Sequence, residues 1–247
     1  MAGSGFTPPS DCDKDTIHGN RTKLWDVAQL TPDRAHQGYV FLGGDIFFNF
    51  DKKTNKLLVP KIRITGIECP KVLGTTLPNY WQAAWDEAEK NFGKNVDILL
   101  GINSFDGRTQ DQLHIHMTGL HREVRTYLDS LDSKSLILSN WNSNIFVLKI
   151  PKDTYVYRVA HVDNLSTNAF DLLEQYVSKP YSDRFAQSLA IVRGPKGNGY
   201  LLIATQGKAT QQGQPAHIPD LKVYDKQSTT TYYGTSTVEP LMDRNWK

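Results

Sequence analysis

The feature that most constrains the fold of this chain is the order of its β-prone and helical runs. Residues 38–65 and residues 96–118 each hold β-prone runs separated by glycine or polar residues, which is a hairpin signal. Between them, residues 78–92 repeat apolar side chains at helical spacing, and Pro78 suits a first helical turn. This order predicts two strand hairpins with a helix between them.

The second part of the chain repeats this order. Runs typical of strands occur at 145–159 and 188–204, and a helical run lies between them at 169–177. The two parts share no recognisable sequence, so we expect a duplicated architecture without a sequence repeat. The expected domain covers residues 21–206 and has two similar halves, about 38–131 and 141–206.

The two ends of the chain differ in composition from this domain. Residues 1–20 are rich in Gly, Pro, Ser and Asp and predict a flexible N-terminal arm. Residues 207–247 are polar and predict a C-terminal tail that is extended along the domain or partly disordered. The first residues lack the basic and apolar stretches of a secretory leader. The compartment stays unknown: as written, the chain is expected to be soluble and cytoplasmic, and a secreted or periplasmic location stays open if a leader was removed.

The charge balance restricts the partners of the chain. Among 247 residues, 28 Lys and Arg stand against 26 Asp and Glu, which leaves a net charge of +2. This balance argues against a nucleic-acid partner, because binding to a phosphate backbone needs a concentrated basic surface. It remains compatible with a local pocket for phosphate. No apolar run approaches the roughly 18–20 residues that span a bilayer, so we expect no integral membrane segment.

Cys12 and Cys69 are the two cysteines of the chain. They can form at most one disulfide, which is no framework for a fold. Cys12 lies in the polar N-terminal arm and Cys69 precedes Pro70. With so few cysteines to organise the fold, we expect them to stay unpaired.

The sharpest functional signal is the run at 107–118, which reads GRTQDQLHIHMT. Alternate residues of a strand face the same side, so Gln112, His114 and His116 are expected to project together. The apolar residues between them face the other side and are expected to pack in a core: Leu113, Ile115 and Met117. The pattern predicts imidazoles and an amide on one patch of a sheet.

Neighbouring loops add polar groups to this patch. Arg108 and Thr109 lead directly into it, and Asn103 ends the preceding predicted strand. A guanidinium matches phosphate oxygens bidentately, and an imidazole serves as nucleophile or general acid near neutral pH. An imidazole that attacks phosphorus forms a phosphoramidate, which divides one hard displacement into two easier ones. The patch therefore favours phosphoryl or nucleotidyl transfer.

Three other interpretations of the histidine pair stay open. Structural histidines on a half-buried strand are common. A zinc site is the second, although no cysteine or carboxylate clusters near the pair, and we expect no metal. A two-histidine phosphoesterase is the third, because the run from His116 to Thr118 fits one His-x-Thr motif. The runs after His161 and His217 do not supply the second motif.

Several separate motifs, taken in order, resemble the CDP-diacylglycerol pyrophosphatase family of the histidine triad superfamily. They are RITGIE at 63–68, PNY at 78–80, AW at 84–85, INS at 102–104, GRTQ at 107–110 and QLHIH at 112–116. The resemblance runs from about Leu24 to Gln206 and is most specific between 61 and 125. It implies an α+β fold with a histidine-triad-like antiparallel sheet and flanking helices. It also implies hydrolysis of CDP-diacylglycerol to CMP and phosphatidate.

The resemblance implies roles for single residues as well. The superfamily triad is His-x-His-x-His with the middle histidine as nucleophile, and here Gln112 takes the first place. His114 is then the nucleophile that forms a nucleotidyl-histidine, while His116 and Gln112 orient it or bind phosphate oxygens. Thr109 contacts phosphate, and Asn103 positions the nucleophile.

Three basic residues complete the expected phosphate-binding set. Arg108 lies in the loop before the histidines, and Lys61 and Arg63 are candidates for the other phosphate or the base. The alternative for Lys61 and Arg63 is a solvated strand edge, because isolated surface charges are common.

These observations leave a first function and two alternatives. The first is a hydrolase or nucleotidyl transferase that acts on a small nucleotide pyrophosphate without metal or cofactor. The second keeps the scaffold for a biosynthetic cyclase or lyase with His114 as acid or base. The third is a nucleotide- or lipid-binding protein that uses Tyr80, Trp81 and Trp85 as a ligand wall, although their helical spacing favours a core position. Superfamily members often dimerise, so a homodimer is open, but two internal halves would make it unnecessary.

Overall fold

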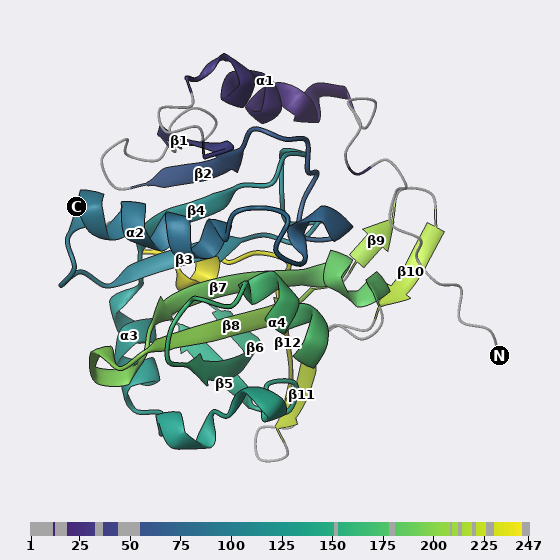
Figure 1. The fold of residues 1–247 in the computed structure, drawn as a ribbon. Helices are drawn as coiled ribbons and strands as arrows, with labels where there is room; N and C mark the ends of the chain where they lie inside the picture. The colour runs from purple at the N-terminus through teal and green to yellow at the C-terminus, as the bar shows by residue number, and fades with distance from the viewer. Residues whose placement is uncertain are drawn as a thin grey trace.

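A large sheet dominates the fold (Figure 1). The computed structural model describes residues 12, 19–32, 37–43, 55–150, 153–177, 181–207, 209–211, 214–218, 221–225 and 230–243. The strands are β1 (Tyr39–Gly43), β2 (Lys56–Pro60), β3 (Ile98–Ile102), β4 (Ile115–Gly119), β5 (Ile145–Ile150), β6 (Asp153–Val162), β7 (Gln187–Arg193), β8 (Tyr200–Gln206), β9 (Ala209–Gln211), β10 (Gln214–Ile218), β11 (Lys222–Asp225) and β12 (Thr230–Tyr233). Residues 44–54 of the predicted hairpin at 38–65, and most of the predicted arm at 1–20, lie outside the described residues.

The sheet consists of two similar halves that meet at β3 and β7. The strand order is β1-β2-β4-β3 in the first half and β5-β6-β8-β7 in the second. Each half carries one helix between its second and third strand, α2 (Tyr80–Phe92) and α4 (Ala169–Tyr176). The central pair β3–β7 is antiparallel, with Leu100 opposite Ile191. The expected α+β class, with an antiparallel sheet, flanking helices and two similar halves, is confirmed. One further pair, β12 with β6, is parallel.

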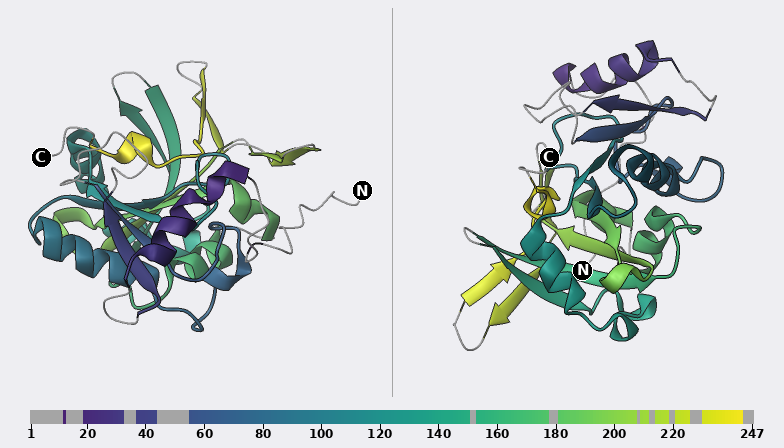
Figure 2. Two further views of the ribbon diagram at one scale, coloured as in Figure 1. Left: turned by 90° about the horizontal axis from the view of Figure 1, so that it is seen from above. Right: turned by 90° about the vertical axis from the view of Figure 1, so that its left-hand side faces the viewer.

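Helices α2 and α4 cover one face of the sheet (Figure 2). Asn79 caps α2 by accepting a hydrogen bond from the Gln82 amide, and Gly93 ends it at a φ of 99°, which favours glycine. Three aromatic residues of α2 are almost fully buried in this core: Tyr80, Trp81 and Trp85. Their burial agrees with the helical spacing and removes the ligand wall that a binding protein would need.

The opposite face carries two smaller apolar clusters. Helix α1 (Lys23–Leu30) packs Leu24 and Ala28 over β1 and β2. Helix α3 (Arg122–Asp129) and the C-terminal segment, defined here as residues 234–243, cover the middle of the sheet. Strand β4 lies between β2 and β3, so it runs under the boundary between these clusters. The side chains of β4 on this face include His116, one of the predicted catalytic residues.

The C-terminal segment lies against the sheet through backbone contacts. Met242 forms an antiparallel bridge with Leu120, just beyond β4, and the Leu241 oxygen accepts a hydrogen bond from the His121 amide. A Cβ at Gly101 of β3 would lie 2.5 Å from Val238 Cγ2, so only glycine leaves room for this segment. Part of the polar tail predicted at 207–247 thus packs on the face of the sheet that carries the histidines (Figure 1).

The expectation that the cysteines stay unpaired is wrong. Cys12 and Cys69 form a disulfide with a Cα–Cα distance of 5.5 Å, which joins the N-terminal arm to the loop before α2. The Cys12 oxygen also accepts a hydrogen bond from the Thr65 amide at 3.0 Å. The composition of the arm describes its side chains only. It could not predict this backbone hydrogen bond, which brings the two cysteines together.

Among the described residues, no helix combines the length and the apolar character that crossing a membrane requires.

Candidate functional site

The two histidines lie side by side at the start of β4. His116 stands in register between Leu57 of β2 and Gly101 of β3, on the face that α1 and the C-terminal segment cover. His114 directly precedes the strand, which begins at Ile115, so Gln112 and His114 lie before the strand on which the sequence pattern placed them. The ring centroids are 5.0 Å apart, and the exposed fractions are 4% for His114 and 2% for His116. The intervening apolar residues pack in the core on the other face, as predicted: Leu113, Ile115 and Met117.

A main-chain carbonyl orients the His114 ring. Its Nδ1 lies 2.7 Å from the Gln112 oxygen. A carbonyl oxygen can only accept a hydrogen bond, so Nδ1 carries the proton and Nε2 is left with its lone pair. Such a bond fixes both tautomer and orientation. His114 therefore presents an unprotonated ring nitrogen, which is the form that a nucleophile requires.

Burial keeps both imidazoles neutral. Desolvation, with smaller contributions from His116 and Arg108, lowers the pKa of His114 to about 3. Desolvation lowers the pKa of His116 to about 4. Both values lie well below the ordinary value of 6.5, so both rings are uncharged at neutral pH.

The Gln112 side chain points to the backbone of the loop after β2. Its Nε2 donates to the carbonyls of Pro60 and Ile62 at 2.9 and 3.0 Å. Its Oε1 accepts from Arg63 Nη1 and from the Ile64 amide, both at 3.4 Å. Gln112 thus fixes this loop beside the histidines with its side chain and orients His114 with its carbonyl.

Arg63 is buried beside Gln112. Its guanidinium also lies over the Trp25 ring of α1, with the Arg63 Cζ 5.7 Å from the ring centroid. Arg63 is therefore not on a solvated strand edge, which was the alternative that the sequence left open.

Arg108 sits in a buried network of charges. Its Nη1 and Nη2 donate to both carboxylate oxygens of Glu68, at 2.6 and 2.8 Å, and its Nε donates to Asp111 at 3.1 Å. Burial, the largest single effect, raises the pKa of Glu68, but the charge of Arg108 and the hydrogen bonds from Arg108, the backbone and Thr65 together lower it below its ordinary value. The sequence pattern assigned this guanidinium to phosphate, but all three of its nitrogens are hydrogen-bonded to carboxylates of the protein itself.

Two other predicted phosphate contacts occupy different surroundings. Lys61 donates to the Thr31 oxygen at 3.0 Å, just beyond the carboxyl end of α1, where a cation is favourable. Thr109 is exposed on the loop before the histidines. The structure therefore brings Gln112, His114 and His116 together, while the ammonium group of Lys61 is bonded to the end of α1.

Asn103 connects the site to the C-terminal segment. Its Oδ1 accepts from the Val238 amide at 2.9 Å, and its Nδ2 donates to Glu239 Oε1 at 3.1 Å. Glu239 is a residue that sequence reasoning missed, because it lies in a polar tail without periodicity or a motif. No sequence signal marked it. Glu68, in contrast, stands in the RITGIE motif and could have been assigned as the partner of Arg108.

Within the described part of the chain, no group of three or more His, Cys, Asp or Glu side chains is arranged to hold a metal ion. Among the described residues, the two histidines are therefore not part of a group of three such side chains arranged around a metal ion.

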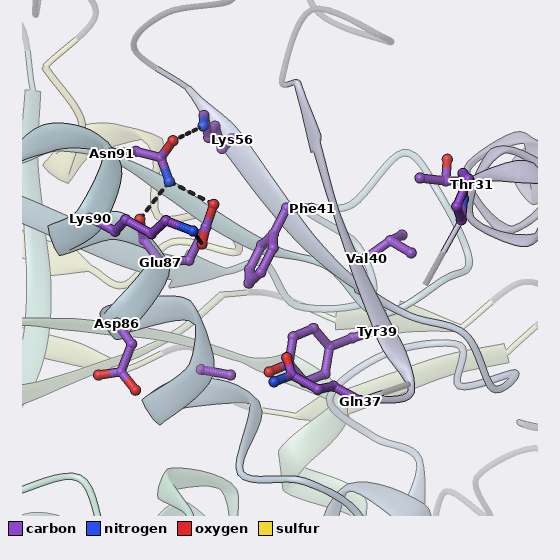
Figure 3. A pocket seen from close by; sticks show the side chains of 12 residues that line it. Thr31, Gln37, Tyr39, Val40, Phe41, Lys56, Asp86, Glu87, Lys90 and Asn91 are labelled. Atoms are coloured by element: carbon purple, nitrogen blue, oxygen red, sulfur yellow. Dashed lines mark hydrogen bonds and ion pairs between the residues drawn. The ribbon is translucent and has the colours of Figure 1, made fainter. Parts of the chain in front are cut away.

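A cavity of about 740 Å³ lies elsewhere, between α2 and β1 (Figure 3). Tyr39 and Phe41 of β1 line one side, and Asp86 and Lys90 of α2 line the other. The described residues that line it include neither histidine. The chemistry of the histidine pair, and not the volume of this cavity, identifies the candidate site.

A family profile and a curated relative name the same family. The family profile for CDP-diacylglycerol pyrophosphatase matches residues 33–228. A curated relative, the CDP-diacylglycerol pyrophosphatase of Yersinia pestis, is 35% identical over 163 residues, which cover 63% of this chain and 61% of the relative. The chain therefore spans about three fifths of that relative's length.

Two solved structures are similar at low identity. Yeast Ap4A phosphorylase Apa2 is 12% identical, with a TM-score of 0.36 and coverage of 68% of this chain and 56% of its own. A DUF4931 family protein from Bacillus cereus is 14% identical, with a TM-score of 0.35 and coverage of 74% and 88%.

Proposed function

The chain belongs to the CDP-diacylglycerol pyrophosphatase family, and from this premise we propose that it hydrolyses CDP-diacylglycerol to CMP and phosphatidate with His114 as nucleophile. The observation that carries the proposal is the hydrogen bond from His114 Nδ1 to the Gln112 carbonyl. It leaves the lone pair of Nε2 for attack, and burial keeps the ring neutral at physiological pH.

The reaction proceeds in two displacements at the cytidylyl phosphorus. In the first, His114 Nε2 forms a bond to phosphorus, and the bridging P–O bond breaks with its electron pair going to phosphatidate. The Nδ1 proton stays on the ring, so the imidazole of the nucleotidyl-histidine carries a positive charge. In the second, water attacks the same phosphorus, the N–P bond breaks, and the electron pair returns to Nε2. Water gives its oxygen and one hydrogen to CMP and releases one proton to solvent.

The remaining residues of the predicted site support this chemistry in different ways. Gln112 holds the nucleophile by its main chain and the loop after β2 by its side chain. We assign His116, Arg63 and Thr109 to the phosphate oxygens, because the first two are buried beside His114 or Gln112 and Thr109 is exposed on the loop before the histidines. Lys61 belongs to the same loop as Arg63 and is assigned to the second phosphate.

Arg108 acts at one remove. Its bidentate pair with Glu68 and its bond to Asp111 fix the loop that leads into the histidines. Its positive charge also contributes to keeping His114 neutral. In this proposal, Arg108 attracts the phosphate through its electrostatic field and does not contact it.

The test is to trap the intermediate. The protein is incubated with CDP-diacylglycerol in detergent and with CDP-choline as a water-soluble pyrophosphate, quenched in base to preserve phosphoramidates, and analysed by peptide mass spectrometry. A cytidylyl adduct on His114, absent in His114→Ala, is the expected result. EDTA is expected to leave the rate unchanged.

A matched control is His121→Asn, because His121 caps α3 and asparagine caps equally well. This variant keeps full activity. An adduct on His116, or full activity in His114→Ala, would overturn the assignment of the nucleophile. Turnover of another substrate by a pathway that still needs His114, with both pyrophosphates untouched, would favour the cyclase or lyase alternative.

A further inference from the structure

The C-terminal segment delivers a carboxylate to the histidine-bearing face. Val238 donates its amide to the Asn103 side chain, and Glu239 accepts from the same side chain at 3.1 Å. Asn103 directly follows β3, the strand that pairs with the histidine-bearing β4. One amide side chain therefore holds two consecutive residues of a segment more than a hundred positions away in the sequence.

Contacts on both sides of Glu239 fix its position. Before it, the Ser236 oxygen accepts from the Ser104 amide and hydroxyl at 3.1 and 3.0 Å. After it, Leu241 bonds to the His121 amide at 2.9 Å. The glycine at position 101, which stands opposite His116 in the β3–β4 register, is what lets Val238 approach the sheet. Glu239 is thus anchored over β3 and β4, and not at the end of a loose tail.

The carboxylate acts on buried groups of two strands. It raises the pKa of His114, against the larger effect of burial. It also contributes to the raised pKa of Tyr157 on β6, whose buried hydroxyl makes no hydrogen bond among the described residues. A negative charge that reaches both His114 and Tyr157 is directed inward over the sheet.

We propose that Glu239 is a positioning residue of the histidine site, which holds Asn103 and balances the positive charge of the nucleotidyl-histidine. The proposal rests on the function proposed above. In that reaction the His114 ring is neutral in the free enzyme and cationic after the N–P bond has formed. A fixed carboxylate stabilises the second state more than the first, so its effect falls on the chemical step and not on substrate binding.

The test compares Glu239→Gln with wild-type protein, because glutamine keeps an oxygen that accepts from Asn103 and removes only the charge. Glu123→Gln is the control, since Glu123 is an exposed carboxylate on α3. We expect kcat to fall about 10–100-fold in Glu239→Gln, with KM within about twofold of wild type. Glu239→Asp is expected to lie between them, and Glu123→Gln to match wild type.

A second readout separates charge from structure. Titration of ¹⁵N-labelled histidine by NMR is expected to give a lower pKa for His114 in Glu239→Gln than in wild type, because the favourable negative charge is gone. A wild-type kcat and an unchanged His114 pKa in Glu239→Gln would overturn the inference, while loss of activity in His114→Ala leaves the proposed function standing. If wild-type protein forms no adduct on His114, the proposed function and this inference are both wrong.

Discussion

His114 Nδ1 lies 2.7 Å from the main-chain oxygen of Gln112, two residues earlier in the chain. Because the acceptor belongs to the main chain, no substitution of the Gln112 side chain removes it. The tautomer of the nucleophile is therefore set by the backbone just before β4. The Gln112 side chain has a separate task, which is to satisfy the carbonyls of Pro60 and Ile62.

This separation predicts different outcomes at the two positions. Gln112→Leu leaves the buried Pro60 carbonyl and the partly buried Ile62 carbonyl without their donor and is expected to lower the free energy of unfolding by about 1–3 kcal/mol. It keeps measurable activity, because His114 retains its tautomer. His114→Gln is expected to lose activity by about 10³-fold or more. Urea unfolding and initial rates for the two variants check this, and equal losses of activity would contradict it.

The pH dependence of the rate follows from the buried imidazoles. Neutral His114 is the active form, and its pKa is lowered to about 3, with that of His116 at about 4. The acid limb of kcat/KM is therefore expected below pH 5, and not near the ordinary value of 6.5. A profile from about pH 3 to 8 in buffers of constant ionic strength measures it. A limb centred near 6.5 would mean that His114 is solvated in the free enzyme.

The same shifts predict how stability changes with pH. Each imidazole has a lower pKa in the folded chain than in the unfolded chain, so the unfolded state binds more protons below pH 6.5. The contribution of the pair is complete above pH 6.5 and is lost as pH falls toward 4. The free energy of unfolding is expected to fall less between pH 7 and 5 in His114→Gln/His116→Gln than in wild type. Identical slopes would show that the rings titrate normally in the fold.

The alternation of polar and apolar residues was sufficient to predict the core side of β4. Leu113, Ile115 and Met117 are buried as expected, because an apolar side chain in an alternating run has one favourable side. The helical spacing of residues 78–92 likewise predicted the burial of Trp81 and Trp85. Local patterns of this kind depend on neighbours in sequence, and for that reason they were readable.

Long-range polar pairings were not readable in the same way. Arg108 was assigned to phosphate because a guanidinium fits an anion, but a buried carboxylate of the chain itself, Glu68, fits it equally well. Glu239 reaches the site only through the course of the C-terminal segment across β3. Neither composition nor periodicity encodes which distant carboxylate will be brought to a given base.

The buried pair of Arg108 and Glu68 is expected to be costly to break. Arg108→Met leaves the Glu68 carboxylate buried without its partner and is expected to lower the free energy of unfolding by about 3–5 kcal/mol. The double variant Arg108→Met/Glu68→Met is expected to lose less than the sum of the single variants, because it leaves no charge of this pair unpaired. Urea unfolding of the four proteins forms the cycle that measures the coupling. Additive losses would indicate that the pair is solvated.

The disulfide between Cys12 and Cys69 is expected to stabilise the fold mainly by restricting the unfolded chain. It closes a sequence separation of 57, and a loop of that length corresponds to about 4 kcal/mol in the chain-entropy treatment, as an upper value. Cys12→Ala/Cys69→Ala is therefore expected to unfold at a lower temperature than wild type in the absence of reductant. Reductant is expected to lower the unfolding temperature of wild type toward that of the variant and to leave the variant unchanged. An equal response of both proteins would show that the cysteines are not bridged. Activity of the variant at low temperature is expected to match wild type, because neither sulfur contacts the histidine pair.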